Sequence, residues 1–182
     1  LIVLTRTDTI TDADGDTATA SASLNIGQAL SFKDDGPSIV VNAVAGADAL
    51  GVDETVLATN ASADFADNFS VTNSFGADGA GSLSTSYSLS ISGGDGTDSG
   101  LNNLAGQDIL LYNNAGVIEG RVGGTVYFTV SVDSSGTVTL DQQLAIQHPN
   151  ASNPDDAVTL SAADLIVLTR TDTITDADGD TA

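Results

Sequence analysis

The stretch Thr125–Asp133 reads TVYFTVSVD and decides the fold class. Every second residue from Val126 to Val132 is apolar, so one side of an extended chain is apolar and the other is mostly polar. This period of two is typical of a half-buried β-strand. The sequence Asp-Ser-Ser-Gly at 133–136 then favours a turn, and Thr137–Leu140 resumes the alternation. The region therefore predicts two antiparallel strands.

Two further segments, Thr17–Ile26 and Ser82–Ser92, alternate in the same way. Turn-forming pairs such as Asp-Gly, Gly-Gly and Asn-Asn recur about every ten residues along the chain. No long segment has the period of an amphipathic helix. Many short strands at this spacing predict an all-β fold, an antiparallel β-sandwich of immunoglobulin-like or cadherin-like type.

The composition excludes several classes of function. The chain has 182 residues, with 25 acidic and 4 basic side chains and a net charge of −21. A surface this negative would repel the phosphates of a nucleic acid. The absence of Cys excludes thiol catalysis, disulfides and zinc–thiolate sites. No apolar run is long enough to insert into a membrane as a helix. Most carboxylates have no protein cation to pair with, so any cluster of them needs an external cation.

The last 18 residues, Leu165–Ala182, repeat Leu1–Ala18 letter for letter. An identical copy at a spacing of 164 residues indicates a tandem array. The sequence Asp-Asp-Gly-Pro at 34–37 favours a boundary, because Gly and Pro end a strand and stiffen the chain. We therefore predict the final strands of one repeat at 1–35, a linker at 34–38, and the start and centre of the next repeat at 38–182.

In this division, the later repeat lacks counterparts of Thr19–Phe32. We expect neighbouring repeats as partners, and residues 1–35 of another copy could supply the missing strands, because an exposed strand edge invites pairing.

The clearest candidate metal site is the segment Asp12-Ala13-Asp14-Gly15-Asp16, repeated at Asp176, Asp178 and Asp180. Carboxylates at every second position around a Gly turn can converge on one hard cation, and Ca²⁺ takes six to eight oxygen ligands from flexible loops. The spacing is not that of an EF-hand, because position six is Thr17 instead of Gly. The alternative is an acidic hairpin turn that stays solvated.

A second candidate combines Asp34 and Asp35 at the boundary with Asp53 and Glu54. Two carboxylates about 4 Å apart repel by roughly 4 kcal/mol at an effective dielectric constant near 20. A divalent ion would relieve this repulsion and fix the linker angle. The alternative is a polar hinge whose charges stay hydrated.

Three weaker candidate ligands are Asp78 in a Phe-Gly-Ala-Asp-Gly loop, Glu119, and Asp155 in the Pro154-Asp155-Asp156 loop beside the sole His148. Glu119 could instead pair with Arg121, which shares its strand face.

No arrangement of nucleophile and base can be assigned, and aromatic residues are only 4% of the chain, so we expect no enzyme. A carbohydrate- or surface-binding module is the alternative function.

Several motifs occur in an order that resembles the tandem extender repeats of giant RTX adhesins of bacteria. They are TITDADGDTA at 9–18, NIGQAL at 25–30, DDGPSI at 34–39, VDET at 52–55, FGADG at 75–79 and VIEGR at 117–121.

This resemblance implies Ca²⁺-dependent β-sandwich repeats of a protein exported by type I secretion and held at the outer membrane. The repeats would project a distal ligand-binding region from the cell surface for adhesion and biofilm formation. The resemblance also implies Ca²⁺ at the junctions between repeats, which directs attention to Asp34, Asp35, Asp53, Glu54 and the Asp12–Asp16 loop. We therefore expect an extracellular, calcium-rigidified spacer.

Overall fold

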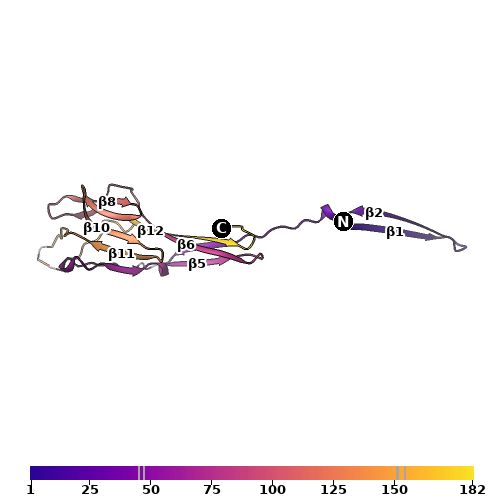
Figure 1. Cartoon of the computed structure of the whole chain (residues 1–182), viewed down its shortest axis with the longest axis horizontal. Coiled ribbons are helices and arrows are strands. Elements are labelled where there is room, and N and C mark those ends of the chain that lie inside the picture. Colours follow the sequence, from indigo (N-terminus) through magenta and orange to yellow (C-terminus); the bar gives the residue numbers. More distant parts are fainter. Residues whose placement is uncertain (45, 47, 151, 154) are drawn as a thin grey trace. The chain divides into compact units, whose positions relative to one another are not determined.

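The computed structural model describes residues 1–44, 46, 48–150, 152–153 and 155–182. The chain divides into two compact units, Leu1–Asp35 and Gly36–Ala182 (Figure 1). The part of the chain that the structure describes contains no helix with the length and hydropathy needed to span a bilayer.

The first unit is a single hairpin. Strand β1 (Val3–Thr11) pairs antiparallel with β2 (Thr17–Asn25), and the single-turn 3₁₀ helix η1 (Gly27–Ala29) follows. Every residue of both strands is exposed, including Leu4, Ile10 and Leu24. A two-stranded hairpin without a packed face is at best marginally stable in water. This unit therefore has strand geometry but no core of its own.

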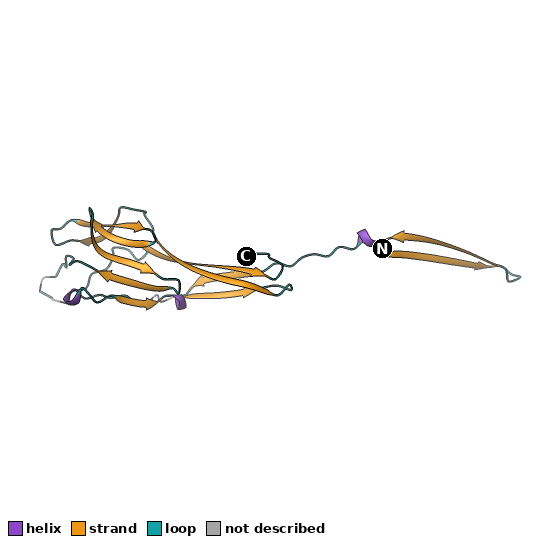
Figure 2. Cartoon of the chain, in the orientation of Figure 1, coloured by secondary structure: helices purple, strands orange, loops and turns teal. Residues whose placement is uncertain are grey.

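The second unit holds the remaining strands (Figure 2). They are β3 (Ser38–Ala43), β4 (Ala61–Asp64), β5 (Phe69–Ser74), β6 (Ala80–Ile91), β7 (Thr97–Asn102), β8 (Asp108–Asn114), β9 (Val117–Val122), β10 (Thr125–Val132), β11 (Thr137–Gln142) and β12 (Ile166–Asp176). Two further 3₁₀ turns are η2 (Glu54–Val56) and η3 (Ala66–Asn68).

Antiparallel pairing organises these strands into one large sheet and two ribbons. The six-stranded sheet has the order β4-β11-β10-β9-β8-β7, and the ribbons are β12-β6 and β3-β5. β12 also lies near β3. The prediction of an all-β fold made of antiparallel sheets is confirmed, and the arrangement is consistent with a β-sandwich.

The hydrophobic core lies between the six-stranded sheet and the β6 strand. Its buried members are Leu89, Ile91, Ile109, Leu111, Ile118 and Phe128. They occupy alternate positions of their strands, as the period of two predicts. Gly120 on β9 leaves room for the Phe128 ring, because a Cβ at residue 120 would overlap that ring.

The alternating segments of the sequence correspond closely to observed strands. Thr17–Ile26 contains β2, Ser82–Ser92 overlaps β6, and Thr125–Asp133 contains β10. The turn predicted at 133–136 is held by the Asp133 carboxylate, which accepts hydrogen bonds from the amides of Ser135 and Thr137. The Ser135 hydroxyl also donates a hydrogen bond to Asp133, and this bond is the main cause of a pKa of Asp133 below its usual value. The amide hydrogen bonds lower the pKa further.

Candidate metal centre

The acidic segment after β12 folds into a closed turn. Thr175 bridges to Thr181, and Ile174 and Ala182 exchange two backbone hydrogen bonds of 3.0 Å. Gly179 adopts a φ of +109°, which a residue with a side chain rarely takes. Asp176 Oδ1 accepts hydrogen bonds from the amides of Gly179 at 3.1 Å and Asp180 at 2.8 Å. The backbone therefore fixes one oxygen of Asp176 inside the turn.

Three carboxylates converge at this turn, which we call the β12 turn. One carboxylate oxygen each from Asp176, Asp178 and Asp180 lies within 4.8 Å of the others. Asp78, in the loop before β6, has an oxygen within 4.8 Å of one from Asp178. Asp78, Asp178 and Asp180 are exposed, whereas Asp176 is only 3% exposed.

The second carboxylate oxygen of Asp176, Oδ2, is buried and has no hydrogen-bond partner among the described residues. Burial acts to raise the pKa of Asp176, but its hydrogen bonds with the Asp178 side chain and with the amides of Asp180 and Gly179 outweigh it. The pKa of Asp176 therefore lies below its usual value, and the group is a carboxylate at neutral pH. A buried charged oxygen without a partner is costly unless a cation is present.

This donor set fits a hard divalent cation. Ca²⁺ binds carboxylate and carbonyl oxygens at about 2.3–2.6 Å and tolerates irregular geometry. Asp176 Oδ2 would be the anchoring ligand, with oxygens of Asp178 and Asp180 beside it. Nitrogen and sulfur ligands preferred by zinc are absent from the group.

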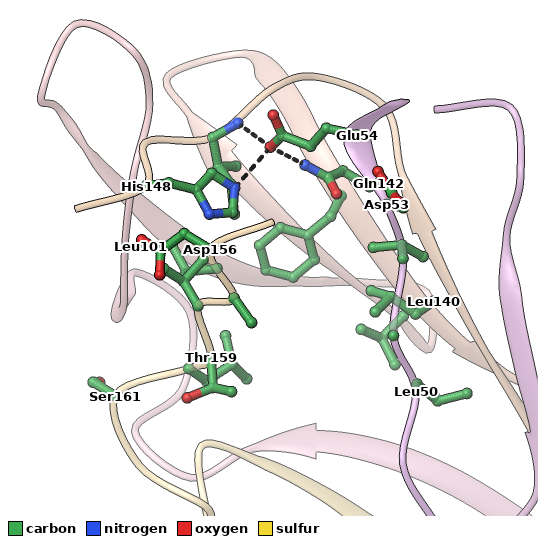
Figure 3. A pocket seen from close by; sticks show the side chains of 18 of the residues that line it. Leu50, Asp53, Glu54, Leu101, Leu140, Gln142, His148, Asp156, Thr159 and Ser161 are labelled. Carbon is green, nitrogen blue, oxygen red and sulfur yellow. Dashed lines mark hydrogen bonds and ion pairs between the residues drawn. The ribbon is translucent and has the colours of Figure 1, made fainter. Parts of the chain in front are cut away.

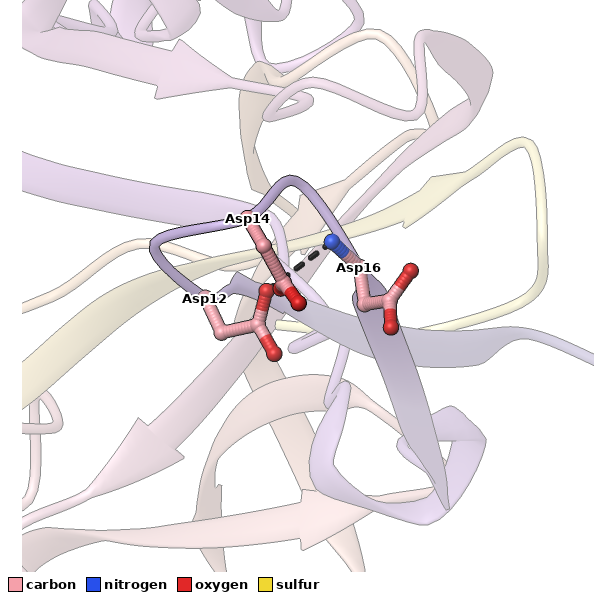
Figure 4. Close-up of side chains that lie close together, drawn as sticks. All are labelled: Asp12, Asp14 and Asp16. Carbon is pink, nitrogen blue, oxygen red and sulfur yellow. Dashed lines mark hydrogen bonds between the residues drawn. The ribbon is translucent and has the colours of Figure 1, made fainter.

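The identical segment after β1 forms the same turn without burial. Asp12, Asp14 and Asp16 converge within 4.8 Å, and the amide of Asp16 donates to Asp12 Oδ1 at 2.9 Å (Figure 4). The hydrogen bond with Asp14 is the main cause of a lowered pKa of Asp12. All three residues are exposed. The turn is thus a local property of the sequence, whereas burial depends on the rest of the second unit.

Neighbouring backbone from the start of β6 encloses Asp176. Asp176 lies opposite Ala80, and the amide of Ala177 donates to the carbonyl of Gly79 at 3.1 Å. Gly81 approaches the carbonyl of Asp176 so closely that a Cβ there would clash. Residues 79–81 therefore form one wall of the β12 turn, and the first unit has no such wall around Asp12.

The predicted ligands at the boundary belong to different units. Asp34 and Asp35 end the first unit, and both are exposed. Asp53 caps η2 by accepting a hydrogen bond from the amide of Thr55 at 2.8 Å, and its bonds with Thr55 lower its pKa.

Glu54 lies at a cavity of about 970 Å³ in the second unit (Figure 3). Its Oε1 accepts hydrogen bonds from Gln142 Nε2 at 2.7 Å and the amide of Ile146 at 2.8 Å. His148 Nε2 lies 3.4 Å from the same oxygen, while His148 Nδ1 is buried without a hydrogen-bond partner among the described residues. Glu54 therefore has hydrogen-bonding partners at the end of β11 and in the segment after it, contacts that the sequence alone does not predict.

Among the described residues, the remaining predicted ligands do not belong to the groups of acids that converge at the β12 turn. Glu119 accepts a hydrogen bond from Asn114 and forms an ion pair with Arg121, which stacks on the Tyr112 ring at 5.5 Å. The Asn114 bond is the first cause of its lowered pKa. Asp155 is exposed, and its amide donates to Asn153 Oδ1. Pro154 of that loop lies outside the described residues.

Each arginine of the chain forms an ion pair with an acidic side chain of its own strand. The ion pairs are Arg6 with Asp8, Arg121 with Glu119 and Arg170 with Asp172, each joining side chains two residues apart on one strand. These three are all the arginines of the chain. In a strand, residues two apart lie on the same face. The spacing of Arg170 and Asp172 in the sequence could therefore have predicted this buried ion pair.

Comparison with known proteins gives one match. The model of a family described as "Domain of unknown function (DUF5801)" matches residues 49–182, which is more than half of the chain. No curated protein and no solved structure matches.

Proposed function

Starting from the fact that this chain belongs to the DUF5801 family, we propose that it is a calcium-rigidified extender segment of a bacterial cell-surface adhesin. The single observation that carries the proposal is the buried Oδ2 of Asp176, which lies in a cluster of three carboxylates and has no hydrogen-bond partner in the part of the chain that the structure describes. A Ca²⁺ ion at this position supplies the missing partner and neutralises the cluster.

The excess of acidic over basic side chains favours a bound metal cation, instead of a lysine or arginine side chain, as the partner of the clustered carboxylates. The chain has 25 acidic side chains and only 4 from Lys or Arg. The three arginines each pair with an acid two residues away, and the fourth basic side chain is Lys33. Like charges at about 4 Å repel by roughly 4 kcal/mol at an effective dielectric constant near 20. Such turns, repeated along an array, favour a dication at each copy.

The exact repeat supports a mechanical role. An array of identical domains projects whatever lies at its end, and cations that bind each copy stiffen it. Extracellular calcium-binding modules have dissociation constants of about 10⁻⁴–10⁻³ M. Such sites fill outside the cell and stay largely empty in the cytosol, so the chain remains pliable until it is exported to the cell surface. The resemblance to the extender repeats of RTX adhesins supports the same surface location and the same role in adhesion and biofilm formation.

Calcium removal tests this proposal. At a calcium concentration 100 times the dissociation constant, which is about 10–100 mM for the range given above, a site specific for the folded state adds about 2.7 kcal/mol to stability. We expect excess EDTA to lower the Tm of the second unit by about 5–10 °C, given roughly 2–4 °C per kcal/mol for a domain of this size. We also expect the maximum dimension measured by small-angle X-ray scattering to decrease when calcium is removed.

The repeat offers a matched control for this experiment. Asp176→Asn should remove most of the calcium-dependent rise in Tm, because it neutralises the buried ligand, whereas Asp12→Asn changes an exposed carboxylate of the same sequence. A rise in Tm that Mg²⁺ reproduces in full, or that survives in Asp176→Asn, would refute calcium binding at the β12 turn. A calcium-dependent Tm with unchanged dimensions would refute the stiffening role alone.

A further inference from the structure

The cavity beside Glu54 is a second candidate binding site in the second unit. Three strands of the six-stranded sheet, β7, β10 and β11, contribute to its lining, together with residues 50–55 and 155–163. Its volume of about 970 Å³ lies at the upper end of the range for small-molecule sites, which is roughly 300–1,000 Å³. In the described part of the chain, the three acids of the β12 turn do not line it.

The strands give the cavity a largely apolar wall. Phe128 and Val130 come from β10, Leu101 from β7 and Leu140 from β11. Phe128 belongs to the buried core, and the other three side chains pack against that core. This part of the wall is therefore held in place by the sheet, and it can remove the apolar body of a ligand from water.

The polar groups gather at one end of the cavity. Figure 3 shows Glu54, Gln142 and His148 together there, away from Thr159 and Ser161. All the hydrogen-bonding contacts that Glu54 makes with described residues go to Oε1. The other oxygen of this carboxylate, Oε2, is left to accept a hydrogen bond from a ligand.

His148 offers a second acceptor at the same end. Its Nε2 faces the Glu54 carboxylate and therefore carries a proton, so Nδ1 of the neutral imidazole is an acceptor. Nδ1 is buried and has no hydrogen-bond partner in the part of the chain that the structure describes. Buried polar atoms normally have a partner. The polar end of the cavity thus presents two acceptors to a donor that the described residues do not supply.

The charges around the cavity define the sign of that donor. No lysine or arginine is among the described residues that line the cavity, whereas four acids are: Asp53, Glu54, Asp155 and Asp156. A cleft lined by charges of one sign concentrates ligands of the opposite sign. A cationic donor is therefore favoured, and an anionic ligand is repelled.

We propose that this cavity binds an apolar primary amine. The ammonium group donates hydrogen bonds to Glu54 Oε2 and His148 Nδ1, and the hydrocarbon body lies against Phe128, Val130 and Leu140. An ammonium has three N–H donors, so it satisfies both acceptors. An alcohol has one donor and no charge, and a carboxylate has no donor.

Three ligands with one hydrocarbon skeleton test this proposal on the unaltered chain. Isothermal titration calorimetry at neutral pH compares 4-phenylbutylamine, 4-phenylbutan-1-ol and 4-phenylbutanoate. We expect the amine to bind at least tenfold more tightly than the alcohol, because its hydrogen bonds are charge-assisted, and the carboxylate not to bind. An alcohol or carboxylate that binds as tightly as the amine would overturn the proposal, as would an amine that does not bind at about 10 mM, the concentration of a very weak ligand.

A pair of variants assigns the binding to Glu54. Glu54→Gln keeps an oxygen that can accept from Gln142 and removes the charge, so it should weaken amine binding at least tenfold and leave alcohol binding unchanged. Asp108→Asn makes the same change of charge at an exposed residue that is not among those lining the cavity, and should alter amine affinity less than twofold. Equal effects of the two variants would contradict the assignment. Competitive displacement of the amine by Ca²⁺ would also contradict it, because Glu54 would then bind a metal ion.

Discussion

Replacing Ile174 by alanine should lower the free energy of unfolding of the second unit by about 3 kcal/mol. The Ile174 side chain is fully buried, so truncation loses its burial and leaves a cavity. The same substitution at Ile10, which is 72% exposed in an identical stretch of sequence, should change stability by less than about 0.5 kcal/mol. Urea denaturation followed by tyrosine fluorescence measures both values.

The positions of the tyrosines make fluorescence specific for the second unit. All three tyrosines, Tyr87, Tyr112 and Tyr127, belong to the second unit, and there is no tryptophan. The signal therefore reports the unit that contains Ile174. Equal costs for Ile174→Ala and Ile10→Ala would mean that β12 is not packed as the structure has it.

The second large effect is expected at Asp172, whose carboxylate is buried. It accepts hydrogen bonds from Arg170 Nε at 2.7 Å and from the Thr85 hydroxyl, and Arg170 lies over the Tyr87 ring at 5.7 Å. Asp172→Ala leaves the largely buried guanidinium without its counter-charge, which typically costs about 3–5 kcal/mol. Asp8→Ala breaks the same pair in its exposed copy and should have no measurable effect.

The Arg170–Asp172 ion pair should make the free energy of unfolding fall as the pH is lowered. Burial acts to raise the pKa of Asp172, but the hydrogen bonds from Arg170 and Thr85 outweigh it, so the folded pKa lies below the usual 3.8. The stabilisation is therefore complete above the pKa of the unfolded chain and is lost as the pH falls through the lower folded pKa. Acid titration of the unfolding free energy should show a steeper loss for the wild type than for Asp172→Asn. Identical acid limbs would exclude Asp172 as a source of this dependence.

The sequence predicted local structure well. Alternation at Thr125–Asp133 and Ser82–Ser92 identified strands because the period of two reflects a half-buried sheet face. The acidic turn was also predictable: both copies bring their carboxylates together, since Gly at the fourth position and amides within the turn suffice. These features depend only on residues close together in the chain.

Burial could not be predicted in this way, and the repeat shows why. Asp12 and Asp176 have identical sequence neighbours, yet only Asp176 is buried, because the wall at 79–81 comes from almost a hundred residues earlier in the chain. Glu54 likewise acquires partners at Gln142 and Ile146. The neighbouring acids Asp53 and Glu54 favour a cation site in the sequence. In the folded chain, Glu54 accepts hydrogen bonds from residues about ninety positions away and lines a cavity. Local patterns do not encode such long-range contacts.

Anomalous X-ray scattering from crystals of the whole chain grown in millimolar CaCl₂ tests the calcium proposal most directly. We predict an anomalous difference peak about 2.3–2.6 Å from Asp176 Oδ2, with oxygens of Asp178 and Asp180 in the same coordination shell. A water molecule or a monovalent ion hydrogen-bonded to Asp176 Oδ2 under these conditions, with no anomalous signal, would contradict it.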